Sequence, residues 1–176
     1  PVADANGTGA IDVTATDPDG GQTTQRLDVT VDPVNDAPRP PQLTTPEADA
    51  TLNAVAGSSA PILAAWTAAT DVDGDALDYR WQLSLSSDFD APILDADVAS
   101  ATQYRTTVGA LDVLLDGLGV TVGDSVSAFH RVVVRDGVAE TASQARAVML
   151  KRASLSVNQP PALATTLPDL ALSFAF

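Results

Sequence analysis

Two short segments near the start of the chain alternate between apolar and polar residues. Residues 10–16 and 26–32 each place every second side chain on one face, which is the period of a half-buried β-strand. Residues 17–22 (DPDGGQ) lie between them and carry the proline, aspartates and glycines of a tight turn. The pattern predicts an antiparallel hairpin whose apolar face consists of Ile11, Val13, Ala15, Leu27, Val29 and Val31. Because a two-stranded hairpin is at best marginally stable in water, residues 1–37 are not expected to be a domain alone.

The central region contains enough strand patterns to close a β-sandwich. Residues 61–69 (PILAAWTAA) predict a strand with Trp66 toward the core. Residues 76–86 (ALDYRWQLSLS) alternate clearly, and residues 124–137 return to the same period before residues 141–152 supply a last strand. We expect the inward side chains to be Leu77, Tyr79, Trp81, Leu83 and Leu85 in the first of these segments and Val126, Ala128, His130, Val132 and Val134 in the second, with Asp78, Arg80, Gln82, Ser84, Arg131 and Arg135 outward.

One segment has the period of a helix instead. In residues 108–119 (VGALDVLLDGLG), Leu111, Leu114, Leu115 and Leu118 occur at i, i+3, i+4 and i+7, which places them on one stripe. Gly117 and Gly119 offer a C-terminal stop. We therefore expect one short helix packed on the sandwich.

Proline-rich segments stand on both sides of the central region. Residues 32–42 (DPVNDAPRPPQ) contain four prolines, which suit neither a helix nor a central strand. A second junction begins with the residues NQPP at 158–161. These junctions predict a hairpin that ends one module (1–37), a proline-rich linker (38–41), a complete sandwich (42–156), and a final segment that is the first strand or strands of a further module or a donor strand (157–176).

The flanking segments carry recognisable motifs. Residues 7–38 join two strand patterns through a TATDPDGG turn and end in VNDAP, and residues 158–170 (NQPPALATTLPDL) begin with an N-x-P-P junction followed by a Pro-Asp pair. The first stretch resembles the last two strands and the linker of bacterial cadherin-like, immunoglobulin-like repeats. The second resembles the first strand of such repeats.

The central region carries a different set of motifs. It has a W-T-x-x-x-D-x-D-G-D run from Trp66, the short leucine-rich helix, and an R-V-x-x-x-D-G strand from Arg131. These features resemble the fibronectin type III-like module of SusE-type outer-membrane proteins and other surface proteins of the Bacteroidota, although His130 stands where that family often has Trp. The resemblance implies a cell-surface or secreted module and does not imply starch binding. The expected fold class is all-β: an immunoglobulin-like or fibronectin III-like β-sandwich with one short helix, flanked by partial β-sandwich segments.

Charge and composition exclude several classes of partner. The chain has 23 acidic and 9 basic residues, a net charge of −14, which repels nucleic-acid phosphates and anionic membranes and attracts cations. No apolar stretch approaches the length of a transmembrane helix. The absence of cysteine excludes disulfides and zinc thiolate sites. We expect no nucleic-acid partner and no transmembrane segment.

Calcium is the one cofactor that the acidic residues suggest, because hard cations bind several carboxylate and carbonyl oxygens. Three places concentrate such groups: Asp17 with Asp19, Asp71 with Asp73 and Asp75, and Asp32 with Asn35 and Asp36. The middle set is no EF-hand, since Gly74 stands fourth instead of sixth. Asp and Gly also favour turns whatever the function, so simple turn chemistry is the alternative for each set. The cadherin-like resemblance implies that a D-x-N-D junction helps to hold calcium, and D-P-V-N-D at residues 32–36 matches it.

The sequence contains no recognisable set of catalytic residues. His130 is the single histidine, it falls on an inward strand face, and no nucleophile elbow, phosphate loop or HExxH motif accompanies it. We expect a packed core histidine and no enzyme. A surface glycan-binding module is the alternative function, but Trp66 and Trp81 both fall on core faces and few other rings could form a sugar platform.

Self-assembly follows from the unpartnered strands at both ends. Residues 170–176 (LALSFAF) present Leu170, Leu172, Phe174 and Phe176 as an apolar strand face that could complete another copy's sheet by strand addition. The hairpin face of Ile11, Val13, Leu27, Val29 and Val31 is the matching surface, and such a head-to-tail contact would build a filament. The alternative is a segment of a longer tandem array whose adjacent modules cover these strands. The predicted function is an extracellular or cell-surface structural or adhesive module in a filament, stalk or adhesin.

Overall fold

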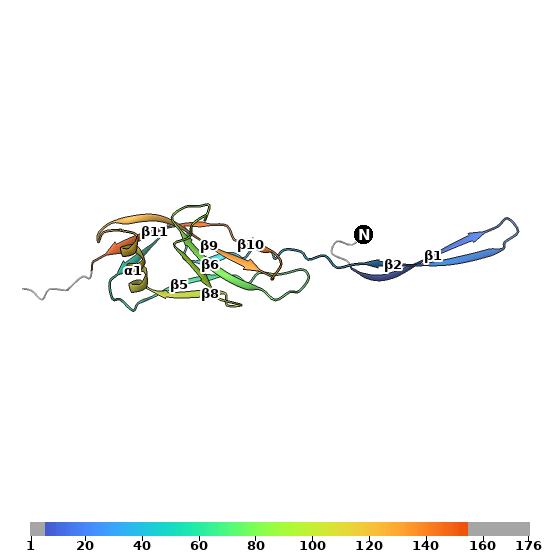
Figure 1. Ribbon diagram of the computed structural model, residues 1–176, viewed down its shortest axis with the longest axis horizontal. Coiled ribbons are helices and arrows are strands. Elements are labelled where there is room, and N and C mark those ends of the chain that lie inside the picture. The colour runs from blue at the N-terminus through green and yellow to red at the C-terminus, as the bar shows by residue number, and fades with distance from the viewer. Residues whose placement is uncertain (1–5, 155–176) are drawn as a thin grey trace, which may run out of the picture.

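The N-terminal alternating segments form a hairpin that stands apart from the rest of the chain. The computed structural model describes residues 6–154, and Figure 1 shows the hairpin extending away from the remaining strands. β1 (Gly7–Thr16) and β2 (Gln22–Val31) pair antiparallel, with Ile11 opposite Leu27 and Gly9 opposite Val29. All residues of both strands are exposed, because nothing in the described chain packs against either face.

The larger sheet of the sandwich has the strand order β4-β11-β9-β6-β7, and a short strand β10 also pairs with β9. β4 and β11 pair parallel, and the other pairs are antiparallel. The strands are β4 (Ala50–Val55), β6 (Asp78–Ser84), β7 (Leu94–Asp97), β9 (Ser125–Arg135), β10 (Glu140–Ala142) and β11 (Arg146–Ala153).

The smaller sheet has the antiparallel order β3-β5-β8. Its strands are β3 (Leu43–Thr45), β5 (Pro61–Trp66) and β8 (Gln103–Thr107). A single helix, α1 (Val108–Gly117), follows β8 directly. The consecutive strands β3 and β4 belong to different sheets, so the chain crosses from one sheet to the other. The two sheets form the two layers of a sandwich around one core. The described residues thus have the expected fold class, an all-β fibronectin III-like sandwich with one short helix and a flanking hairpin.

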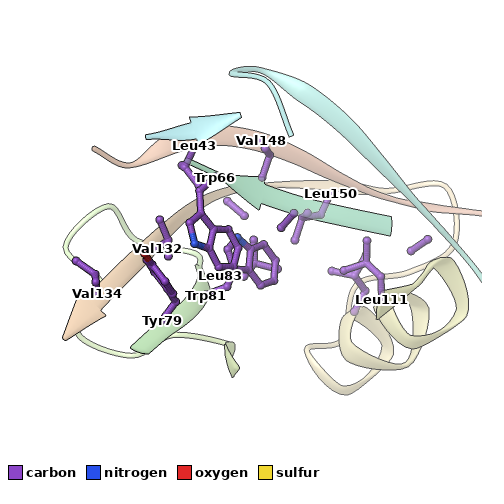
Figure 2. Packing of buried hydrophobic residues seen from close by; sticks show 14 residues of the cluster. Leu43, Trp66, Tyr79, Trp81, Leu83, Leu111, Val132, Val134, Val148 and Leu150 are labelled. Atoms are coloured by element: carbon purple, nitrogen blue, oxygen red, sulfur yellow. The ribbon is translucent and has the colours of Figure 1, made fainter. Parts of the chain in front are cut away.

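The core lies between the two sheets and α1. Trp66 from β5 packs against Tyr79 from β6, with ring centroids 6.0 Å apart. Figure 2 shows these rings beside Trp81, with Leu111 reaching the cluster from α1. The predicted inward residues Tyr79, Trp81 and Leu83 of β6 are buried in the structure. In β9, Ala128, His130, Val132 and Val134 are buried as predicted, and Val126 is half-buried.

Two positions of β6 differ from the expected alternation. Gln82 and Ser84 were expected to face outward, but both are buried. The Gln82 amide accepts a hydrogen bond from Arg131 Nε at 2.8 Å and donates one to Asp95 at 2.9 Å. The guanidinium of Arg131 in turn lies 4.2 Å from the centroid of the buried Phe89 ring. Polar side chains and the loop after β6 therefore cover the face of β6 that points away from the core. The alternation of residues along one strand does not predict such a cover. Leu85, expected to face inward, is exposed because β6 ends one residue earlier.

The helix begins and ends where its sequence predicts. Thr107 caps the N-terminus, since its Oγ1 accepts a hydrogen bond from Ala110 N at 3.1 Å. Leu111 and Leu115 are buried against the sandwich. Leu118, expected on the same stripe, is exposed because the helix ends at Gly117. Gly119 follows the last turn with a φ of 77°, a conformation that favours glycine.

Candidate functional site

Residues 32–42 connect the hairpin to the sandwich, and we call this whole segment the linker below. Its hydrogen bonds to one end of the sandwich include the following three. Asp36 N donates to Asp73 Oδ2 at 2.8 Å, and Asn35 Nδ2 donates to Asp136 Oδ2 at 3.0 Å. Arg39 N donates to Thr70 O at 2.9 Å. The proline-rich segment is thus held where it enters the sandwich, and the hairpin projects from this junction (Figure 1).

Three carboxylates lie together at this junction. One carboxylate oxygen from each of Asp71, Asp73 and Asp75 lies within 4.8 Å of the others. Asp71 Oδ1 accepts a hydrogen bond from Asp73 N at 2.9 Å, which folds the loop back on itself. Asp71 Oδ2 is buried and has no hydrogen-bond partner among the described residues. A buried, unpaired carboxylate oxygen is costly, and a hard cation such as Ca²⁺ would satisfy it.

Asp136 adds a further negative charge at the junction. Its carboxylate accepts hydrogen bonds from Ala139 N, Asn35 Nδ2 and Val138 N, and these bonds hold the pKa of Asp136 below its ordinary value. Asp136 therefore stays ionised at neutral pH. The junction collects acidic groups from the linker, the loop after β5 and the turn after β9, three segments far apart in the sequence.

The remaining predicted metal ligands are not part of this cluster. Asp17 and Asp19 lie in the turn between β1 and β2, at the hairpin tip. Asp17 Oδ1 accepts hydrogen bonds from Asp19 N at 3.0 Å and Gly21 N at 2.7 Å, so this carboxylate shapes the turn. Asp32 follows the last residue of β2 at the start of the linker. Of the predicted sets, the structure connects the linker with the loop of Asp71, Asp73 and Asp75 and leaves the hairpin turn separate.

The hairpin presents the predicted apolar face to solvent. The exposed fraction is 58% for Val13, 57% for Leu27 and 36% for Val29. Gly7 and Gly9 lie opposite Val31 and Val29, and no atom lies within 4 Å of a Cβ built on either glycine. The predicted partner residues Leu170, Leu172, Phe174 and Phe176 lie outside the described residues.

A second apolar feature, a groove of about 280 Å³, lies between β7, β8 and α1. Trp81 and Leu83 form part of its lining, with Leu94 from β7 and Tyr104 from β8. The Tyr104 ring stacks on Trp81 with centroids 5.2 Å apart and planes 20° apart. The sequence pattern does not indicate this groove, because β7 and β8 have only four and five residues and so show no clear alternation of apolar and polar positions. The side chain of Trp81 is only 2% exposed, so this ring offers no open sugar platform.

Comparisons with known proteins show no family for this chain. No family model and no curated protein sequence matches the chain. Among solved structures it is similar to a nucleoside hydrolase-related hypothetical protein from Saccharophagus degradans that is associated with carbohydrate metabolism, with 18% identity and a TM-score of 0.32 over 68% of this chain and 26% of that one. It is also similar to the FN1–FN3 domains of chicken CNTN1, with 11% identity and a TM-score of 0.33 over 82% of this chain and 44% of that one.

These likenesses carry no argument about function, and the chain spans less than half of either protein. The resemblances to cadherin-like repeats and to SusE-type modules therefore stay predictions. Within residues 6–154, the structure contains no helix with the length and apolarity needed to cross a bilayer.

Proposed function

We propose that the chain is an extracellular structural module, a repeat segment or subunit of a cell-surface stalk, filament or adhesin. The observation that carries this proposal is the hairpin: ten paired residues on each strand with one apolar face and no cover from the described chain. Covering a half-exposed Val or Leu stabilises by about 1 kcal/mol, so a neighbouring module or copy that packs here gains several such contributions. The sequence resemblances to surface modules support the extracellular location.

The linker supports a mechanical role. Proline fixes φ and stiffens the chain, and the bonds from Asn35, Asp36 and Arg39 to the sandwich restrain its exit direction. A module held at a set angle transmits force along an array. The neighbour's strands and this hairpin would then form one sandwich across the module boundary.

Calcium binding at the junction is part of this proposal. The ligands would be Asp71, Asp73 and Asp75, with the linker residues Asn35 and Asp36 beside them. A bound ion would bring the linker and the sandwich loop together and stiffen the joint. Binding at a calcium concentration of about 100 times Kd would stabilise the folded chain by about 2.7 kcal/mol.

Thermal unfolding tests the calcium proposal. We expect CaCl₂ to raise the Tm of the native chain and EGTA to reverse the rise. Asp71→Asn should abolish the calcium-dependent rise, whereas Asp28→Asn, an exposed hairpin residue, should keep it. An identical Tm with calcium and with EGTA in the native chain would exclude the ion from this role.

Assembly is tested by a matched pair of hairpin variants. Val29→Lys places a charge on the apolar face, and Asp28→Lys places the same side chain on the opposite face. We expect electron microscopy and light scattering to detect assemblies in the native chain and in Asp28→Lys but not in Val29→Lys. Equal assembly in the two variants would contradict a role for the apolar face. Removing residues 170–176 tests the donor strand separately, since unchanged filaments would exclude it.

A further inference from the structure

The groove between β7 and β8 lies where the sandwich has two unpaired strand edges. β7 is the last strand of the larger sheet and β8 the last of the smaller one, and no described strand pairs with their outer edges. Leu94 from β7 and Thr106 from β8 line the groove, and Leu114 from α1 forms part of its wall. An edge strand offers a row of free backbone N–H and C=O groups, so an added strand beside β8 would gain hydrogen bonds and place alternate side chains in the groove.

The C-terminal part of the described chain leaves the sandwich at the same end as the groove. β11 ends at Ala153, and the preceding Arg152 is paired with Asp112 of α1 at 2.8 Å. Figure 1 shows this end of β11 beside α1, on the side of the sandwich away from the hairpin. The chain therefore continues from a point next to the helix that lines the groove.

The chain beyond this point is long enough to return to the groove. Residues 154–169 span up to about 55 Å when extended, at roughly 3.4 Å per residue. The longest strand of the sandwich, β9, has 11 residues, which corresponds to about 36 Å. The segment 170–176 can thus reach any part of its own sandwich, and its tether gives an effective concentration of about 1 mM or more.

The composition of residues 170–176 matches the groove. The segment LALSFAF carries no charge and alternates large apolar residues with Ala and Ser, in a chain whose net charge is −14. As a strand it would direct Leu170, Leu172, Phe174 and Phe176 to one side. We propose that the apolar groove between β7 and β8 receives residues 170–176 of the same chain, added as a strand beside β8.

This docking goes beyond the proposed function, because it concerns the end of the sandwich away from the hairpin. Docking of residues 170–176 in their own chain also restricts the proposed assembly. A chain that holds residues 170–176 in its own groove cannot give them to the hairpin of a neighbour. Docking in the same chain would therefore produce a subunit that does not assemble. Release of residues 170–176 from the groove would produce a subunit that can donate this strand to a neighbour. The groove and the neighbour's hairpin compete for one segment.

Engineered disulfides test the docking, since the native chain contains no cysteine. Arg105→Cys places a thiol on the exposed face of β8, and Ala171→Cys, Ser173→Cys or Ala175→Cys places one on the small-residue face of the segment. Paired strands bring facing Cβ atoms within disulfide range. We expect at least one of the three double variants to form a disulfide within a single chain, seen by non-reducing electrophoresis and intact mass. Its yield should be about tenfold above that of Val138→Cys paired with the same residue.

Each other result overturns the inference. A disulfide only between two chains would place the segment in another copy's groove. A disulfide of Ser173→Cys with Gln25→Cys on the hairpin, and none with Arg105→Cys, would overturn the docking while leaving the proposed function standing. No disulfide in any variant would overturn the docking as well. As a second measurement, Leu114→Lys in the groove wall should lower the yield about tenfold, whereas Val138→Lys should not, with folding of both checked by circular dichroism. An unchanged yield in folded Leu114→Lys would contradict docking in the groove.

Discussion

Mild acid should destabilise the sandwich through one buried histidine. The side chain of His130 is fully buried, and its Nδ1 accepts a hydrogen bond from Trp81 Nε1 at 3.3 Å. Its Nε2 is buried and has no hydrogen-bond partner among the described residues. Burial, together with the positive charge of Arg146, lowers the pKa of His130 from 6.5 to about 4, and the nearby Pro46 carbonyl opposes this shift only in part. The folded chain therefore keeps this imidazole neutral at a pH where the unfolded chain protonates it.

The size of the effect follows from this difference in pKa. Because the folded pKa lies below the unfolded one, the contribution of His130 is fully present above pH 6.5 and is lost as the pH falls toward 4. Over the whole window the loss approaches about 3 kcal/mol. Between pH 7.5 and 5.5 it amounts to about 1.3 kcal/mol, which is large beside a typical domain stability of about 5–15 kcal/mol.

Urea unfolding followed by tryptophan fluorescence measures this loss, since Trp66 and Trp81 both lie in the sandwich core. The control is His130→Gln, which does not titrate and whose amide oxygen can still accept the Trp81 N–H. The 23 acidic residues titrate alike in both chains, so they cancel in the comparison. We expect the native chain to lose about 1.3 kcal/mol more than His130→Gln between pH 7.5 and 5.5.

Equal losses in the two chains would refute the reasoning. That result would mean that the folded chain protonates His130 as easily as the unfolded one. A larger loss in His130→Gln than in the native chain would contradict the sign of the argument. Measurements at pH 7.5 alone are not sufficient, because the substitution also changes packing in the core.

Two further pairs of variants test packing around α1, with the free energy of unfolding from urea titration as the measurement. Gly109→Ala should destabilise the folded chain by about 1–3 kcal/mol, because the new Cβ would lie 2.7 Å from the backbone oxygen of Ser58. The new Cβ of Gly117→Ala meets no atom within 4 Å, so this variant should stabilise the folded chain by about 0.5–1 kcal/mol. Equal effects at the two glycines would contradict this account. Leu115→Ala should cost about 2.7–5 kcal/mol because the side chain is fully buried, and Val113→Ala, at 72% exposure, should change stability by less than about 0.5 kcal/mol. A loss below about 1 kcal/mol for Leu115→Ala would mean that α1 does not close the core.

The alternation of apolar and polar residues predicted correctly those strands that have one face against the core and the other in solvent. Tyr79, Trp81 and Leu83 are buried as the alternation in β6 indicates. The same alternation was wrong for Gln82, because Arg131 and the loop after β6 cover that face. Burial of a polar residue depends on partners from other strands, and a period-two pattern contains no information about them. The short strands β3, β7 and β10 have three or four residues each, too few for a period to be read.

Local sequence signals are enough to predict several features of this protein. The hairpin, its apolar face, the helix with its glycine stop and the closeness of Asp71, Asp73 and Asp75 all depend on residues near one another in the chain. Turn chemistry and side-chain period act over a few residues, so they can be read directly from the letters.

The tertiary structure, in contrast, settles which distant segments meet. It brings Asn35 to Asp136 and Asp36 to Asp73, and these hydrogen bonds hold the proline-rich linker against the sandwich. It also formed the groove from β4, β5, β6, β7, β8 and α1, none of which carries that surface alone. Strand pairing and sheet packing join residues separated by many positions, and these choices depend on the whole core instead of any local pattern.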